Sequence, residues 1–140
     1  AGILVESDLR GVLSHGTWQL RRYAEEIRGG GLNPEPHARV VEEGPATAVV
    51  DGDGGLGYFA ARLAAEVAIA RAKEMGTAAV LARNHGHIGA AGLYTRMALP
   101  HGCAALCTSG VDVRSHFPRK RAAPPHILWA GAGGPISSSG

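Results

Sequence analysis

A serine and a histidine adjoin each other at Ser14 and His15, followed by Gly16, in the stretch DLRGVLSHGTWQLRRY (residues 8–23). Histidine is the side chain most readily poised for proton transfer near neutral pH, and a neighbouring serine on a turn can orient it. The sequence offers no obvious acid to complete a triad. Gly16 would leave room for a substrate to approach the imidazole. The stretch therefore predicts acid–base catalysis by His15, with Ser14 beside it.

The same residues also suit a structural role. Ser14 or Thr17 can cap the helix expected to follow, because a hydroxyl oxygen can accept a hydrogen bond from the free N–H groups of a helix start. Such a cap needs only a hydroxyl residue and does not require the imidazole of His15. A catalytic histidine and a helix-capping turn are thus the two alternatives.

Two further histidines, His85 and His87, lie in RNHGHIGAAGLY (residues 83–94), between a predicted strand and a predicted helix. Their spacing invites a metal site, but zinc usually takes three or four ligands and no Cys, Asp or Glu lies close by, so we expect no metal. Backbone N–H groups before a helix attract phosphate, and Gly89 lets a ligand approach the main chain. The stretch predicts a cofactor loop, with an ordinary polar turn as the alternative.

A glycine-rich stretch, VVDGDGGLGYFAARLAAE, places Gly52, Gly54 and Gly57 in the G-x-G-x-x-G spacing of dinucleotide-binding turns. Asp51 and Asp53 flank these glycines, and two carboxylates raise the cost of placing an anion there. We therefore expect a tight structural turn that holds no cofactor phosphate. A Rossmann site is the alternative.

Hydrophobic periodicity predicts the elements that must position these motifs. The strongest helix, residues 56–75, has an apolar side that includes Phe59 and Met75, and Gly76 is expected to end it. The expected elements, in chain order, are a helix end at 1–11, a helix at 17–28, strands at 38–43 and 46–51, the helix at 56–75, a strand at 77–83, a short helix at 90–100 and a strand at 103–109.

Helices and strands interleave, so the fold class is α/β or α+β. A chain of 140 residues with 45% hydrophobic content can bury one core. We expect a helical N-terminal segment at 1–37, a cofactor-binding portion at 38–110 and a basic, Pro- and Gly-rich irregular tail at 111–140.

The composition argues against several partners. A net charge of +2 provides no large field for nucleic acid or an anionic membrane. Neither a signal-peptide pattern nor a bilayer-spanning apolar run is evident, so we expect a cytoplasmic protein. Cys103 and Cys107, four residues apart on the expected strand, would lie roughly 13 Å apart, too far for a disulfide. We expect both to be reduced thiols.

Three stretches together resemble a known family. DLRGVLSHGTWQLRRY, GGGLNPEP…ATAVVDGDGGLG and RNHGHIGAAGLYTRMA occur in the order and spacing of the malate/L-lactate dehydrogenase family of NAD(P)-dependent oxidoreductases. This family is distinct from the Rossmann-fold lactate and malate dehydrogenases, and it includes ureidoglycolate, sulfolactate and diketogulonate dehydrogenases and a cyclic-imine reductase. The resemblance covers residues 1 to about 108. It implies an α+β fold with a mixed sheet and a non-Rossmann cofactor domain, and an N-terminal portion of a longer enzyme.

The resemblance also implies roles for individual residues. His15 would give or take the proton at the substrate oxygen, with Ser14 in its relay, and the Asp-Gly-x-x-Gly turn would be structural. Members of the family are homodimers with the active site near the subunit interface, so we expect a homodimer. One loop would contact the cofactor, NAD or NADP. This loop comprises His87, Ile88, Gly89, Ala90 and Ala91.

The implied reaction is hydride transfer between nicotinamide and a small 2-hydroxy or 2-keto acid, with His15 managing the proton. The family commonly has an arginine four residues after the motif histidine, where this chain has Gln19, so Gln19 and the nearby Arg21 are the candidates for binding the substrate carboxylate. Two alternatives remain: reduction of a cyclic-imine acid, and a non-catalytic module that keeps only a dimerising surface.

Overall fold

The structure is a computed structural model in which residues 2–109 are described, so the expected tail at 111–140 lies outside the described residues. Its elements, in chain order, are α1 (Gly2–Leu9), 3₁₀-helices at Leu13–His15 and Thr17–Gln19, α2 (Leu20–Arg28), β1 (Arg39–Glu43), β2 (Thr47–Asp51), α3 (Gly57–Met75), β3 (Ala79–Arg83), α4 (Gly92–Arg96) and a last 3₁₀-helix at Leu99–His101.

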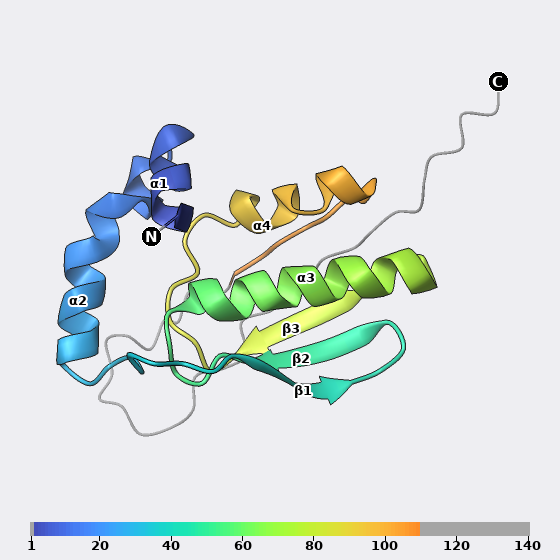
Figure 1. Cartoon of the computed structure of the whole chain (residues 1–140), viewed down its shortest axis with the longest axis horizontal. Helices are drawn as coiled ribbons and strands as arrows, with labels where there is room; N and C mark the ends of the chain where they lie inside the picture. The colour runs from blue at the N-terminus through green and yellow to red at the C-terminus, as the bar shows by residue number, and fades with distance from the viewer. Residues whose placement is uncertain (1, 110–140) are drawn as a thin grey trace.

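The three strands form one mixed sheet in the order β1-β2-β3 (Figure 1). β1 pairs antiparallel with β2, with an irregular register between Val40 and Glu42. β2 pairs parallel with β3, an arrangement that needs a long crossover connection. α3 provides this crossover and packs on one face of the sheet, while α1 and α2 lie beyond the carboxyl ends of β2 and β3. The helices and mixed sheet confirm the α+β class.

The buried face of α3 consists mostly of alanines, with Tyr58 and Ile69 as its large buried side chains. Phe59 and Met75, expected on the buried side, are 53% and 51% exposed, so that expectation is wrong. Small side chains let the helix axis lie close to the sheet, where Val50 and Val80 are fully buried. As expected, the helix ends at Gly76, which takes a left-handed conformation (φ 81°). The buried alanines of α3 are Ala60, Ala61, Ala64, Ala65, Ala68 and Ala72.

The expected strand at 103–109 is wrong, since the structure assigns this segment no strand. Its alternating burial comes instead from packing beside helices: Cys103 lies in a cluster with Ile69 and Ala72 of α3. Alternation shows that one side of an extended segment is buried, but not that the segment pairs with a strand. Cys103 and Cys107 are free thiols, as expected, and burial raises the pKa of the Cys107 thiol to about 11.

The turn after β2 is packed against the turn after β3. Three of its N–H groups donate to backbone carbonyls at the end of β3 and in the turn after it, so these three are not available to a phosphate. This agrees with the expectation of a structural turn. The bonds run from Gly52 N–H to Arg83 O (2.9 Å), from Gly54 N–H to Asn84 O (2.8 Å) and from Gly57 N–H to His87 O (3.1 Å).

The two carboxylates of this turn hold it in place. Asp51 accepts hydrogen bonds from Asp53 N–H and from the Asn84 amide, both at 2.9 Å. Partial burial would raise the pKa of Asp51, but these hydrogen bonds, together with nearby arginines, lower it overall. Asp53 accepts from the Asn33 amide and from His37 N–H, both at 3.1 Å. The carboxylates therefore serve the fold of the turn.

Gly57→Ala tests this packing. A Cβ at Gly57 would overlap the Gly86 carbonyl oxygen, so the backbone of the His87 loop must move. We expect the free energy of unfolding, measured with urea, to fall by about 1–3 kcal/mol, the usual cost of overpacking. Gly92→Ala is the control, because nothing lies within 4 Å of the new Cβ and helix propensity favours alanine. Equal losses in the two variants would contradict the packing.

Candidate active site

The turn that contains His15 is held by the carboxylate of Asp8, at the end of α1. Asp8 Oδ2 accepts hydrogen bonds from Thr17 N–H (3.1 Å) and from the Thr17 hydroxyl (2.6 Å). The expectation that Ser14 or Thr17 caps the following helix is therefore wrong: the Thr17 hydroxyl is a donor, and α2 has no side-chain cap. An ionised carboxylate is the stronger acceptor, so it takes the N–H that a hydroxyl would otherwise serve.

Gly16 lies directly over the same carboxylate. A Cβ at this position would overlap Asp8 Oδ1. We expected Gly16 to leave room for a substrate, but the space at its Cβ is occupied by Asp8. The glycine is thus required for the Asp8 contact that fixes the turn.

Within the turn, the side chains of Ser14 and His15 are hydrogen-bonded to each other. Ser14 Oγ lies 2.9 Å from His15 Nδ1, and the Gln19 amide donates to the Ser14 carbonyl at 2.7 Å. Ser14 is exposed and His15 is half-buried. With Nδ1 engaged, Nε2 is the nitrogen left for proton exchange.

The fold brings His15 next to His87, which comes from the turn after β3. The two ring centroids are 5.3 Å apart and the ring planes are inclined by 32°. Burial lowers the pKa of His87, and the charges of His15 and Arg22 lower it further. The neutral form of His87 is therefore favoured near pH 7.

Two tyrosines continue this cluster into the core. Tyr23 Oη lies 2.7 Å from His87 Nδ1 and 2.7 Å from Tyr58 Oη. The two phenol rings meet edge-to-face, with centroids 5.8 Å apart. Tyr23 was not among the residues expected at the site. The signal that could have identified it is that a tyrosine on a buried face needs a partner for its hydroxyl.

The remainder of the His87 loop is partly structural. Ile88 is 3% exposed, and its carbonyl accepts a hydrogen bond from the Tyr94 hydroxyl. Gly89 has φ of 75°, and a Cβ there would overlap the Tyr58 ring. Its conformation and its close packing both require glycine.

The N–H groups of this loop differ from those of the glycine turn after β2. None of the N–H groups of residues 87–91 donates to an acceptor within residues 2–109. Backbone N–H groups that lack a protein acceptor are available to a ligand or to water. The loop could therefore hold the polar groups of a cofactor, whereas three N–H groups of the turn at 52–57 are already engaged.

The two arginines after the motif differ in their surroundings. Arg21 is paired with Glu25 at 2.9 Å, and its side chain is 90% exposed. Arg22 is paired with Glu26 at 2.9 Å, and its charge acts on His87. Arg22 is thus a cation whose charge is felt at His87.

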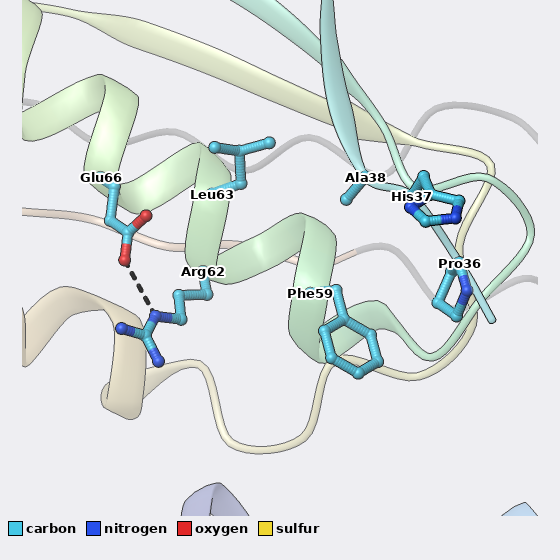
Figure 2. A pocket seen from close by; sticks show the side chains of 7 residues that line it. All are labelled: Pro36, His37, Ala38, Phe59, Arg62, Leu63 and Glu66. Carbon is cyan, nitrogen blue, oxygen red and sulfur yellow. Dashed lines mark hydrogen bonds and ion pairs between the residues drawn. The ribbon is translucent and has the colours of Figure 1, made fainter. Parts of the chain in front are cut away.

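A hollow of about 330 Å³ lies outside this cluster (Figure 2). Neither His15 nor His87 lines it, and Arg62 and Glu66 pair across its side at 2.9 Å. It is therefore not the candidate site. Its lining residues are Pro36, His37, Ala38, Phe59, Arg62, Leu63 and Glu66.

Within residues 2–109, no three His, Cys, Asp or Glu side chains gather into a group that could hold a metal ion. Across the same residues, no helix has the length and apolar character needed to cross a membrane.

Comparison with known proteins identifies the family. The sequence profile of the family described as malate/L-lactate dehydrogenase matches residues 1–121. The chain belongs to this family. Among malate/L-lactate dehydrogenase family members, the malate dehydrogenase of Pyrococcus horikoshii is 48% identical over 103 residues, which cover 74% of this chain and 29% of that protein. The L-sulfolactate dehydrogenase of Methanocaldococcus jannaschii is 42% identical over 99 residues, 71% of this chain and 29% of that protein.

Solved structures of the family have the same fold. The sulfolactate dehydrogenase of Methanocaldococcus jannaschii superposes with a TM-score of 0.70 at 32% identity, covering 89% of this chain and 37% of that chain. The malate dehydrogenase of Pyrococcus horikoshii gives a TM-score of 0.67 at 36% identity, covering 95% and 43%. The chain therefore spans well under half the length of the family members it matches, and its resemblance to the family is confirmed.

Asp8→Ala tests how the His15 turn is held. The variant loses the acceptor for Thr17 N–H, and losing such a capping interaction typically costs about 0.5–2 kcal/mol in the free energy of unfolding. We expect this loss, with faster amide exchange at Thr17. Glu6→Ala is the matched control on α1, because it removes only an exposed ion pair with Arg10 and should cost at most about 1 kcal/mol. Unchanged exchange at Thr17 in Asp8→Ala would contradict the contact.

Proposed function

We propose that this chain serves an NAD- or NADP-dependent oxidoreductase that transfers a hydride between the nicotinamide and a small 2-hydroxy or 2-keto acid. The observation that supports the proposal most is the approach of His15 to His87, at 5.3 Å between ring centroids, in a member of a dehydrogenase family. The two imidazoles come from separate turns, and each has its own hydrogen-bonding partner.

In this proposal His15 is the acid–base group. The hydroxyl proton of a 2-hydroxy acid passes to His15 as the substrate is oxidised, and His15 returns a proton to the carbonyl oxygen in the reverse direction. Ser14, at Nδ1, holds the ring so that Nε2 is directed to the substrate. The nicotinamide cofactor supplies the chemistry of hydride transfer.

The loop His87, Ile88, Gly89, Ala90 and Ala91 is the proposed cofactor contact. Its support is the run of N–H groups that lack an acceptor in the described part of the chain. Because Ile88 and Gly89 are buried, the cofactor would be met chiefly by the partly exposed His87, Ala90 and Ala91.

For the carboxylate of the acid, Gln19 and Arg21 are the candidates from the sequence. The Gln19 amide already donates to Ser14 O, and Arg21 is paired with Glu25. Arg22 is paired as well, with Glu26, but it is the better-supported cation because its charge acts on His87. A positive charge beside the histidine pair would attract a carboxylate.

We further propose a homodimer whose interface lies near the His15 turn. Its support is a group of large apolar side chains around this turn that are more than half exposed. Exposed apolar side chains gathered in one segment are typical of a surface that a partner covers. They are Leu9, Leu13, Trp18 and Leu20.

Titration of the 140-residue chain with NADH and with NADPH, followed by cofactor fluorescence, tests the cofactor assignment. We expect one of the two to bind, and His87→Ala to weaken that binding by roughly tenfold, the value of one good hydrogen bond. His101→Ala is the control, an exposed histidine in the last 3₁₀-helix. Binding that is equally strong in His87→Ala would contradict the assigned loop.

A screen of 2-keto acids with the cofactor that binds completes the same experiment. His15→Ala should lower kcat by about 10²–10⁴, the usual contribution of a positioned general acid. Retained turnover in a folded His15→Ala variant would contradict the proposed role. Binding of neither cofactor would favour the non-catalytic module.

A further inference from the structure

Tyr23, on α2, is hydrogen-bonded to His87 of the proposed cofactor loop. Its hydroxyl lies where α2, α3 and the turn after β3 meet, 2.7 Å from His87 Nδ1 and 2.7 Å from Tyr58 Oη. Tyr23 is 3% exposed, so its hydroxyl is removed from bulk water. A buried hydroxyl with two partners at this distance fixes both of them.

We propose that Tyr23 is a positioning residue that holds His87 in one ring orientation and in one tautomer, with the proton on Nε2. The inference rests on the proposed function in one respect, that His87 meets the cofactor. It assigns to Tyr23 a role that acts through His87.

The direction of the hydrogen bonds decides the tautomer. Among residues 2–109, the Tyr58 hydroxyl has Tyr23 as its hydrogen-bond partner and no other. Tyr58 therefore donates to Tyr23, since any other direction leaves a buried O–H group unsatisfied. The single proton of Tyr23 is then free to be donated to His87. Nδ1 of His87 must accept it, so the proton of the neutral ring is on Nε2.

The surroundings of the His87 ring also favour its neutral form. Burial lowers the pKa of His87, His15 and Arg22 lower it further, and Glu26 raises it. Burial and the hydrogen bond to Tyr23 raise the pKa of Tyr58 well above its usual range, so Tyr58 keeps its proton and remains a donor. No member of the chain Tyr58–Tyr23–His87 is charged near pH 7.

The chemical consequence concerns what His87 offers to a ligand. With Nδ1 occupied by Tyr23, the ring presents an N–H donor at Nε2 without a full positive charge. Such a donor fits an uncharged oxygen acceptor, for example the carboxamide oxygen of a nicotinamide. A ring that could turn or change tautomer would lose part of this selectivity.

The test is side-chain ¹⁵N NMR of His87 in the 140-residue chain at pH 8, without cofactor. We expect wild-type His87 in the Nε2–H tautomer, with Nδ1 shifted by an accepted hydrogen bond. In Tyr23→Phe that shift should disappear and the Nδ1–H tautomer should become populated. Tyr58→Phe is the matched control: it removes a phenol from the same chain, yet Tyr23 can still donate, so His87 should keep its tautomer.

Wild-type His87 in the Nδ1–H tautomer would overturn the inference without any variant. An unchanged ¹⁵N spectrum of His87 in folded Tyr23→Phe, or equal changes in Tyr23→Phe and Tyr58→Phe, would also overturn it. Circular dichroism establishes that each variant is folded.

Cofactor titration separates this inference from the proposed function. If NADH or NADPH binds, Tyr23→Phe should weaken the binding about three- to tenfold. A fixed wild-type tautomer with no binding of either cofactor would contradict the proposed function and leave the role of Tyr23 supported.

Discussion

The contact between the imidazole rings of His15 and His87 is the interaction on which the rest of the site depends. Two unit charges about 5 Å apart repel by roughly 1 kcal/mol in water and by roughly 3 kcal/mol at an effective dielectric constant of about 20. A charge on the His15 ring, 5.3 Å from the His87 ring, therefore disfavours the protonated form of His87. In the proposed reaction the proton transfer is assigned to His15, whose Nδ1 is hydrogen-bonded to Ser14, and the cofactor contact is assigned to the His87 loop.

The contact requires two turns that are fixed independently of each other. On one side, the Asp8 carboxylate holds the His15 turn, and only a glycine at position 16 leaves room for it. On the other side, Gly57 lets the turn after β2 pack against the turn after β3. The alanine face of α3 brings that helix close to the sheet and so places Tyr58 beneath the His87 loop.

The sequence predicted much of the fold, because long periodic segments such as α3 and alternating ones such as β2 depend on local spacing. It also pointed to His15 and His87 as candidate site residues. Their approach to each other could not be predicted, since it results from packing between distant segments. The strand expected at 103–109 failed because alternation does not identify the partner, which is helical. Tyr23 was missed because the partner of its hydroxyl lies on another element.

The most direct test of the contact between the two histidines is the pKa of His87, measured by NMR titration in wild type and in His15→Ala. Burial, His15 and Arg22 lower this pKa and Glu26 raises it, so removing the charge of His15 must raise it. Arg21→Ala, which removes an exposed charge that does not act on His87, should leave it unchanged. A raised pKa of His87 in His15→Ala alone supports the account; a pKa equal to that of wild type would contradict it.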